Sequence, residues 1–390
     1  MNVLTGYPRA NGGWGVRNHV LVLPARAAAN RAAEEIAAAV PGAVAVTHEW
    51  EGVPGDLDAP LVERTLAGFA ANPNVAAVLL VTVLAADDQL GDAIAKRGQR
   101  VELLAMARHG GTAATIAAGI PAARALVQAA GKQAREPMPL SALAVGLECG
   151  GSDALSGITA NPALGIASDR LVAAGATTML SEVPELVGAE ELLAARAINP
   201  EVARRMIAVV HDFERSVEAL GVDIRGAQPT PGNIEGGLTT IEEKSLGAAK
   251  KAGSAPLAGV LDFAQAPSRP GLHVMDTPGH DIEQMVGLVA GGCQLIAFTT
   301  GRGTPTGSPI APCLKISTNS AIFARMAGDI DLDAGRVLDG SESLASMGEA
   351  IHDALLRAAC GEPTCSERRG NREFAIRRTR YERKAEPHVA

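Results

Sequence analysis

The stretch HVLVLPARAAANRAAEEIAAAVPGAVAVTH, residues 19–48, decides the fold of this chain. It consists of an apolar run at 19–24, an alanine-rich stretch at 26–40 and a second apolar run at 43–48. Short apolar runs are typical of buried strands, whereas the longer alanine-rich stretch indicates a helix. The order strand, helix, strand predicts that the fold opens with a β-α-β unit.

The same alternation continues through the first third of the chain. We expect a helix at 59–71, a strand at 75–82, a helix that ends near 96, a strand at 100–105 and a helix at 111–130. Short strands separated by helices predict a parallel sheet that is covered on both faces.

The segment REPMPLS, residues 135–141, interrupts this rhythm with two prolines. Prolines placed between periodic segments indicate a loop or linker, and 390 residues exceed the size of one ordinary core. We therefore expect an N-terminal α/β domain at 1–137 and a C-terminal α/β domain at 138–390, the second carrying most of the site.

The second domain shows the same alternating pattern. We expect strands at 142–147, 177–180, 271–275 and 294–299, helices at 163–174, 185–197, 200–220, 282–290 and 343–359, and a loop at 221–237. Aromatic residues make up only 3% of the chain, which suits tightly packed α/β layers. The predicted fold class is α/β, with two Rossmann-like units and mostly parallel sheets.

Charge and composition exclude several kinds of partner. The net charge of −8 argues against nucleic acid, which is bound through dense basic patches. Glutamates interrupt the basic segment 368–384, so a solvated surface or a subunit contact explains it better. The start MNVLTGYPRANGG lacks a secretory signal, and we find no apolar run of the 18–20 residues that span a bilayer. We therefore expect no membrane partner and a cytoplasmic protein. We also expect reduced thiols, because the five cysteines are odd in number and irregularly spaced.

Polar runs follow five of the expected strands, where ligands bind in open α/β sheets. They are Glu148 to Asp153, Ser181 with Glu182, Asp276 to His280, Thr299 to Thr304, and Lys315 with Ser317, Thr318 and Asn319. None of these runs matches a Walker loop or the dinucleotide fingerprint.

Glycine and arginine give two of these runs a candidate binding role. Gly150 and Gly151 would let the backbone approach a ligand, and Ser152 or Asp153 could cap a helix whose N-terminus favours an anion. A strand-to-helix turn explains the same residues equally well. Arg302, two residues after Thr300 and between two glycines, favours bidentate recognition of a carboxylate.

Other single residues allow more than one interpretation each. Cys149 follows a buried strand and is either an inert thiol or, with its neighbour Glu148, a metal ligand. His280 could be a ligand, a general base or a helix-entry residue. Lys315 is either a solvated lysine or a carboxylate clamp, and the run around Asn233 is either a ligand-closing loop or a turn.

Several long runs, in the same order, resemble the altronate/galactarate dehydratase family, which includes the large subunit of sulfolactate sulfo-lyase. The runs are GYPRANGGWGVRN (6–18), GLECGGSD (146–153), SGITANP (156–162), SEVPE (181–185), PGNIEGGLTTIEEKSLG (231–247), FTTGRGTP (298–305) and KISTN (315–319). The resemblance covers nearly the whole chain.

The resemblance implies an iron-dependent lyase that turns an aldonate or aldarate into a 2-keto-3-deoxy acid. It implies a divalent metal, first Fe²⁺ and otherwise Mn²⁺ or Mg²⁺, held by Cys149 and Glu148. The catalytic candidates are His280, Lys315, Glu182 and His48, and the substrate-binding candidates are Gly150, Gly151, Ser152, Asp153, Asn233, Thr300, Arg302 and Asn319. Proton removal next to a carboxylate builds up charge that a metal or cationic groups must stabilise.

Three cysteines of many relatives are missing from this chain. Their CAN, HxxGC-like and GCE runs correspond to Ala28-Ala29-Asn30, His48-Glu49-Trp50-Glu51-Gly52 and Ala85-Ala86-Asp87. If those cysteines hold iron in the relatives, this chain either binds a harder cation through oxygen ligands such as Glu49, Glu51, Asp87 or Asp88, or has lost that centre.

Relatives of this kind often carry a small β-rich domain, sometimes as a separate subunit. We therefore expect a small carboxylate substrate, a homo-oligomer, and either a small β-rich partner subunit or an independent enzyme with a rebuilt site. Two rival functions remain: a lyase that expels sulfite or another leaving group from a short hydroxy acid, and a non-catalytic binding subunit that kept the fold.

Overall fold

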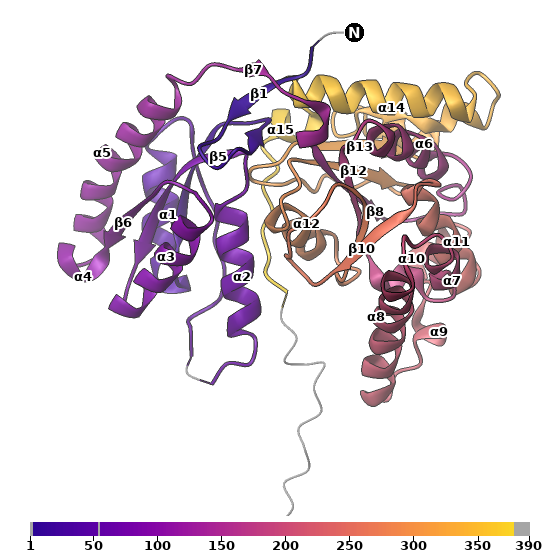
Figure 1. The fold of residues 1–390 in the computed structure, drawn as a ribbon, viewed down its shortest axis with the longest axis horizontal. Coiled ribbons are helices and arrows are strands. Elements are labelled where there is room, and N and C mark those ends of the chain that lie inside the picture. The colour runs from indigo at the N-terminus through magenta and orange to yellow at the C-terminus, as the bar shows by residue number, and fades with distance from the viewer. Residues whose placement is uncertain (1–2, 54, 378–390) are drawn as a thin grey trace, which may run out of the picture.

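Two parallel β-sheets form the framework of the molecule in the computed structural model, which describes residues 3–53 and 55–377 (Figure 1). Within these residues the parallel sheets have four and seven strands, and a small antiparallel sheet has three. The predicted α/β class with mostly parallel sheets is confirmed. Of the basic segment 368–384, the part after Arg377 lies outside the described residues.

The four-stranded sheet has the order β4-β3-β5-β6. Its strands are β3 (His19–Pro24), β4 (Ala43–Ala45), β5 (Val75–Thr82) and β6 (Val101–Ala105), and its helices are η1 (Ala27–Ala29), α1 (Asn30–Ala38), α2 (Ala59–Ala70), η2 (Ala85–Asp87), α3 (Asp88–Lys96), α4 (Met106–His109) and α5 (Thr112–Ala130). Successive side chains of a strand point to opposite faces. Val20 and Val22 accordingly pack in one cluster with α1 and α5, whereas Leu21 and Leu23 pack in another with α2.

The seven-stranded sheet has the order β10-β11-β9-β8-β12-β13-β14. Its strands are β8 (Ala144–Gly150), β9 (Thr177–Leu180), β10 (Leu257–Leu261), β11 (Gly271–Met275), β12 (Leu295–Thr300), β13 (Cys313–Ser317) and β14 (Leu332–Asp333). The chain runs from β8 to β9 on one side and later places β12 on the other side of β8. A ligand site is expected at such a switch point, outside the carboxyl ends of the strands.

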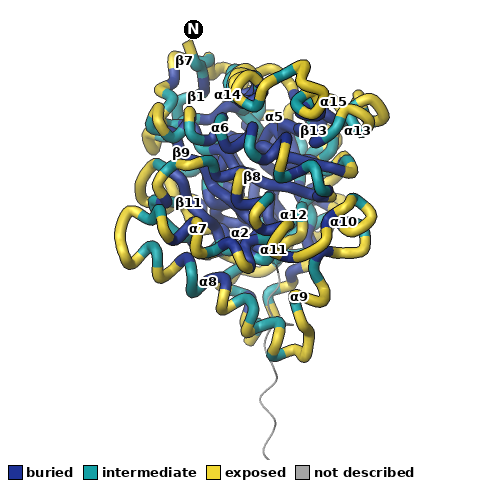
Figure 2. Tube along the Cα trace, turned by 90° about the vertical axis from the view of Figure 1, so that its right-hand side faces the viewer, coloured by how far each residue is buried: buried dark blue, intermediate teal, exposed yellow. Residues whose placement is uncertain are grey.

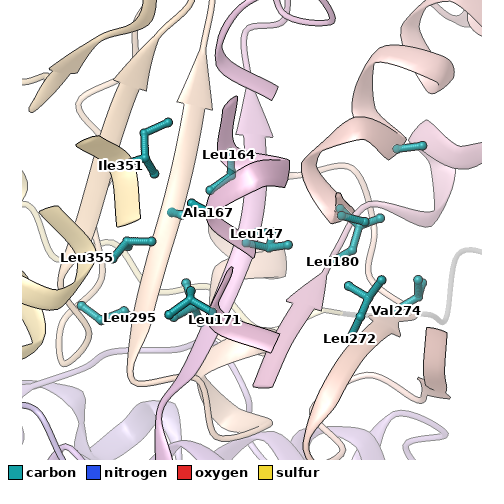
Figure 3. Packing of buried hydrophobic residues seen from close by; sticks show 14 of the residues in the cluster. Leu147, Leu164, Ala167, Leu171, Leu180, Leu272, Val274, Leu295, Ile351 and Leu355 are labelled. Carbon is teal, nitrogen blue, oxygen red and sulfur yellow. The ribbon is translucent and has the colours of Figure 1, made fainter. Parts of the chain in front are cut away.

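Helices cover both faces of this sheet. They are η3 (Leu140–Ala142), α6 (Ala160–Ala173), η4 (Val183–Leu186), α7 (Glu190–Ala194), α8 (Pro200–Ala219), α9 (Ile224–Ala227), α10 (Pro231–Glu235), α11 (Ile241–Ala249), η5 (Lys250–Ala252), α12 (Asp281–Ala290), α13 (Ser320–Arg325), η6 (Ala334–Val337), α14 (Leu344–Ala359) and α15 (Cys365–Arg369). Leu164 of α6 and Ile351 of α14 pack with Leu147 and Leu295 of the sheet (Figure 3). The central strands are buried, whereas much of α8 is exposed (Figure 2).

The two parallel sheets belong to one continuous body. The cluster that contains Leu21 and α2 also contains Ile296 and Phe298 of β12 and residues of α12. α2 and α12 approach closely, because a Cβ on Gly68 would lie 2.4 Å from the carbonyl oxygen of Ala290. The antiparallel sheet, made of β1 (Thr5–Pro8), β2 (Trp14–Gly15) and β7 (Glu136–Pro137), lies at the top of Figure 1. The domain boundary at 137/138 stays a prediction.

Several expected elements are corrected by the structure. Residues 221–237, expected to be a loop, contain the short helices α9 and α10, because Asp223 and Thr230 cap them through their side chains. Lys315 was expected in a loop but lies inside β13, paired with Phe298 of β12. Glu148 and Cys149 likewise belong to β8 itself.

One helix also corrects the expectation that no segment is long and apolar enough to span a bilayer. Within the described residues, only α5 meets that test of length and composition. Its inner side packs on the four-stranded sheet and α1, where a Cβ on Gly119 would lie 2.3 Å from Ile36. Its apolar character comes mainly from alanine, which suits a surface helix as well as a buried one.

Candidate active site

A buried polar cluster lies where β8 and β9 end side by side. Cys149 comes from β8, Glu182 follows β9, Glu185 lies in η4 and Lys251 lies in η5. Because β8 and β9 are parallel neighbours, their carboxyl ends meet at the same edge of the sheet. The side chains of Lys251 and Glu182 are 0% and 1% exposed, so a salt bridge between them is removed from solvent.

Glu182 has an unusual backbone conformation, with φ at 73° in the left-handed region that favours glycine. Its backbone N–H donates to the hydroxyl oxygen of Thr277 at 2.6 Å, and the Ser181 hydroxyl donates to the carbonyl of Leu147 at 3.0 Å. Such a conformation costs about 1–3 kcal/mol and persists where the surroundings hold it. With this backbone conformation the Glu182 side chain forms a salt bridge with Lys251.

Lys251 is positioned by a close contact between η5 and α6. A Cβ on Gly165 of α6 would lie 2.2 Å from the carbonyl oxygen of Lys250, so only glycine allows this approach. Gly253, with φ at 61°, then reverses the chain, and the Asp169 carboxylate accepts from the backbone N–H of Ala255 at 2.8 Å. This packing of η5 against α6 places the Lys251 side chain at the end of β8.

Hydrogen bonds connect the members of the cluster directly. Lys251 Nζ donates to Cys149 Sγ at 2.7 Å and to a carboxylate oxygen of Glu182. The Cys149 thiol lies 3.2 Å from Glu185 Oε2, and Lys244 Nζ lies 2.9 Å from Glu185 Oε1. Two lysines therefore face two glutamates around one thiol.

The surroundings change the acidity of these groups. Burial, opposed by Lys251, raises the pKa of Glu182 to about 7. Burial opposes ionisation of Glu185 as well, but Lys244 and Lys251 lower its pKa overall. Burial, Glu182 and Glu185 raise the pKa of the Cys149 thiol well above its ordinary value. Glu182 is thus poised to exchange a proton near neutral pH.

Glu148 and Gln284 extend the cluster on its inner side. Gln284 Nε2 donates to Glu148 Oε1 at 2.8 Å and to Glu182 Oε1 at 3.2 Å. Burial, Asp281 and Glu182 raise the pKa of Glu148 well above its ordinary value. Its other oxygen, Oε2, has no hydrogen-bond partner within the described residues, which fits a carboxyl group that carries a proton.

Three ligand atoms of the cluster are close enough to hold one metal ion. One atom each of Cys149, Glu182 and Glu185 lies within 4.8 Å of the others, and this is the one such group in the described parts of the chain. However, Lys251 Nζ already bonds to the ligand atoms of two of the three residues. With the ammonium group in this position, the cluster does not fit a metal ion.

A cavity of about 210 Å³ opens next to the cluster. Ser152 and Lys244 line it and also contact the cluster. Ser152 Oγ lies 3.5 Å from Cys149 Sγ, and Lys244 Nζ lies 2.9 Å from Glu185 Oε1. Asn161, Gly157 and Lys250 also line the cavity. Glu182 itself does not line the cavity and its side chain is 1% exposed, so a ligand reaches it only when neighbouring side chains move.

A second polar network brings together four of the predicted binding residues. The Asp153 carboxylate accepts from Thr318 Oγ1 at 2.8 Å and from Asn319 Nδ2 at 3.2 Å. Asn233 Nδ2 donates to the carbonyl of Ser152 at 3.0 Å, and Lys244 Nζ donates to Asn233 Oδ1 at 3.0 Å. The network thus connects α10 and α11 with the loop after β8.

The glycines and the loop after β12 lie at the edge of this network. Gly151 has a φ of 62°, and a Cβ there would lie 3.3 Å from Arg302 Cβ. The Thr300 hydroxyl accepts from the backbone N–H of Gly303 at 3.0 Å, which shapes the loop. Arg302 is half-exposed, 3.5 Å from Glu235, and a Cβ on Gly150 would touch Asp281.

Three predicted catalytic residues do not reach the cluster. The side chain of His280 is 78% exposed at the start of α12. Lys315 is buried and donates to the carbonyl of Pro305 at 2.9 Å. His48 belongs to the other sheet, where its Nε2 lies 2.8 Å from the carbonyl of Pro24 and burial lowers its pKa. Their proposed roles stay predictions without support from this geometry.

The first sheet carries an ion pair near the positions that correspond to the cysteines of the relatives. Arg26 Nε lies 2.5 Å from Asp87 Oδ1, and its guanidinium lies 6.0 Å from the Trp50 ring centroid. Asp87 Oδ2 also accepts from the backbone N–H groups of Val83 and Leu84 at 2.9 Å. Asp87 therefore bonds to Arg26 and to two backbone N–H groups. It belongs to no metal-binding group within the described residues.

Glu185, Lys244, Lys251 and Gln284 were not among the predicted site residues. Glu185 and Lys244 lie inside the quoted runs SEVPE (181–185) and PGNIEGGLTTIEEKSLG (231–247), which could have drawn attention to them. Lys251 and Gln284 stand in helical segments without any polar motif, and only the packing places them at the end of β8.

Comparison with known proteins supports the resemblance over both halves of the chain. The family described as D-galactarate/altronate dehydratase, C-terminal, matches residues 140–381, and D-galactarate dehydratase/altronate hydrolase, second domain, matches residues 6–131. The (2R)-sulfolactate sulfo-lyase subunit beta of Chromohalobacter salexigens is 39% identical over 96% of both chains. The altronate dehydratases of Escherichia coli and Bacillus subtilis are 37% and 33% identical over 95% of this chain and 76% of their own. This chain therefore belongs to the D-galactarate/altronate dehydratase family.

Proposed function

We propose that this protein is a lyase that removes water from a small sugar acid, an aldonate or aldarate, and forms a 2-keto-3-deoxy acid. The observation that carries the proposal is the buried Glu182–Lys251 pair beside the cavity at the end of β8. The names of the altronate dehydratases among its relatives support the same reaction class.

Glu182 is the proposed base. Its pKa of about 7 matches the requirement that a base be partly ionised at neutral pH and still hold a proton well. It takes the hydrogen from the carbon next to the substrate carboxylate, and the electron pair moves into that carboxylate. The ammonium of Lys251 lies beside Glu182 and stabilises the negative charge that develops.

The second half of the reaction expels the hydroxyl group on the neighbouring carbon. The electron pair returns to form a carbon–carbon double bond, the carbon–oxygen bond breaks, and hydroxide leaves. Lys244, which lines the cavity, supplies the proton that makes this leaving group water. The enol then rearranges to the 2-keto acid, and the proton on Glu182 returns to Lys244 through the solvent.

The residues around the cavity are proposed to bind the substrate. Ser152 and Asp153, which line the cavity, and Asn319, which bonds to Asp153, present polar groups to hydroxyls, and Asn233 holds the loop after β8 in place. Arg302, in the loop after β12, is proposed to bind a carboxylate, since its guanidinium is half-exposed and its fork suits that group.

The divalent metal that the resemblance predicts, Fe²⁺, Mn²⁺ or Mg²⁺, has no part in these steps at the cluster. Lys251 already supplies positive charge between Cys149 and Glu182, where such an ion would bind. A metal dependence of this protein would therefore arise from an ion at another position, which metal analysis of the active protein tests.

Expulsion of sulfite from a short hydroxy acid is the second candidate. The match to a sulfo-lyase subunit over 96% of both chains favours it. The same base would remove the hydrogen, and sulfite would leave without a proton. Because that relative is named a beta subunit, we extend the proposal to a small β-rich partner subunit, in a cytoplasmic assembly that contains more than one copy of this chain.

A screen of aldonates, aldarates and sulfolactate for 2-keto acid formation tests the proposal. Detection of sulfite alongside the keto acid distinguishes the two candidates. In D₂O, reversible proton removal would exchange the hydrogen next to the carboxylate even where elimination is slow. Neither keto acid nor exchange with any of these acids, with and without added Fe²⁺ and a partner subunit, would favour the non-catalytic binding reading.

A further inference from the structure

The position of Lys251 has a consequence for metal binding that does not depend on the proposed reaction. Its Nζ lies 2.7 Å from Cys149 Sγ and bonds to Glu182 Oε2, while its side chain is 0% exposed. The same two residues, with Glu185, provide the three ligand atoms that lie within 4.8 Å of one another. One ammonium group therefore stands in contact with the donors that a metal ion would need.

We infer that Lys251 is a built-in cation that keeps the triad of Cys149, Glu182 and Glu185 free of metal, and that its removal converts the triad into a binding site for a divalent transition metal. Lys251 thus acts as a specificity-determining residue, since it excludes metal from a set of donors able to bind it.

Charge is the first reason. Among the groups in direct contact, two glutamates face two lysines, Lys244 and Lys251, so the cluster is balanced when both carboxylates are ionised and the thiol is neutral. A divalent ion added to a balanced, buried cluster would leave uncompensated positive charge, which is strongly unfavourable. Without Lys251, loss of the thiol proton would leave two net negative charges to match the ion.

Space is the second reason. The Lys251 side chain is among the largest that are fully buried in the described residues. Truncation to alanine would leave a polar cavity in which an ion and a water molecule replace the ammonium and the chain that carries it. Lys244 would stay in contact with Glu185, so one carboxylate keeps its present partner.

The donor set indicates which metals would bind. One thiolate and two carboxylates suit borderline ions such as Co²⁺, Zn²⁺ and Fe²⁺ better than Mg²⁺ or Ca²⁺, which prefer oxygen ligands alone. Co²⁺ is the appropriate probe, because bonding to a thiolate produces a near-ultraviolet charge-transfer band that oxygen ligands do not produce. Binding would also release the thiol proton.

The test is titration with Co²⁺ of the wild-type protein and of Lys251→Ala. The wild type is expected to show no thiolate-to-cobalt band, whereas the variant binds one equivalent and shows it. The band is expected to vanish in the double variant Lys251→Ala/Cys149→Ser. Lys250→Ala is the matched control, because Lys250 is the adjacent lysine but donates to the carbonyl of Gly157 at 3.0 Å and to none of the three triad residues.

Two results would overturn the inference. One is a cobalt band in the wild type that Cys149→Ser removes, since Lys251 would then not exclude the metal; this result needs no lysine variant to fold. The other is a Lys251→Ala variant with wild-type circular dichroism that binds no more Co²⁺ than the wild type. Neither result depends on catalytic activity, so failure here is distinguishable from failure of the proposed function.

Discussion

Glu182 is a carboxylate under three constraints at once. Its backbone has a positive φ, its side chain is 1% exposed, and it bonds to a buried lysine. Each constraint costs folding free energy unless its partners compensate, and backbone strain of this kind gathers at functional sites. At the scale of single residues, the predictions therefore centre on Glu182.

Replacing Glu182 with glutamine keeps the shape of the side chain and removes the base. We expect Glu182→Gln to lower kcat by about 10²–10⁴-fold and to abolish hydrogen exchange next to the carboxylate in D₂O. Glu191→Gln, an exposed position of α7, is the control and should leave both measurements unchanged. Exchange at the wild-type rate in Glu182→Gln would assign the proton transfer to another group.

The raised pKa of Glu182 predicts a pH dependence. A base accepts a proton only when it is ionised, so kcat/KM should rise with pH and level off above a pKa of about 7. The pH profile of kcat/KM reports this value for the free enzyme. A rise centred near 4.3, the ordinary pKa of glutamate, would show that the base is exposed or is a different carboxylate.

Only part of the cluster was visible to residue-level reasoning. Cys149 lies near the end of β8 and Glu182 follows β9, both in polar runs, and such positions can be found from the sequence. Lys251 could not be found in this way, because its role depends on the contact between η5 and Gly165 of α6. His280 shows the opposite case: it stands in a polar run but points into solvent.

At the scale of elements, the contact between α6 and η5 controls the position of Lys251. The two elements lie so close together that a Cβ on Gly165 would be 2.2 Å from the carbonyl oxygen of Lys250. Packed interiors yield little to added atoms, so an extra methyl group must move η5 or distort α6.

Gly165→Ala should therefore reduce stability and activity together. We expect a loss of about 1–3 kcal/mol in the free energy of unfolding, measured with denaturant, because the methyl group overpacks the interface. We also expect a lower kcat, because η5 carries Lys251 away from Glu182. Arg170→Ala on the same helix removes a half-exposed ion pair with Glu349 and should cost at most about 1 kcal/mol. Wild-type kcat in Gly165→Ala would mean that η5 adapts without moving Lys251.

The sequence pattern located most elements but misjudged some of their ends. The strand and helix of the opening β-α-β unit appear where the periodicity predicts them. The segment 221–237 appeared to be a loop because glycine and proline suggest turns, yet side-chain caps stabilise two short helices there. The strand around Lys315 was missed because a buried lysine interrupts its apolar pattern.

At the scale of the whole molecule, the two sheets share one hydrophobic cluster. Residues of α2, from the first half, pack with residues of α12 and β12 from the second. Arg17 also bonds to Glu367 at 2.7 Å and so connects the two ends of the described chain. Separate unfolding of either half would expose this shared surface to water.

The shared cluster predicts one unfolding transition. Trp14 packs against the cluster of the seven-stranded sheet and Trp50 lies in the shared cluster, so their fluorescence reports on the contact between the two halves, while far-ultraviolet circular dichroism reports on all helices. The denaturation midpoints from the two signals should coincide. An earlier fluorescence transition would show that the first half unfolds alone, and that the contact between α2 and α12 is weaker than its packing indicates.

The sequence by itself determined the alternation of strands and helices, the α/β class and the family, because these depend on the period of apolar residues and on runs of neighbouring residues. It also placed Cys149 and Glu182 at the ends of strands. Only the tertiary structure decided that Lys251 meets both of them, and that His280, Lys315 and His48 do not. The physical reason is that a contact between segments about 70 to 100 residues apart is set by strand order and by close packing at positions such as Gly165, which no local pattern records.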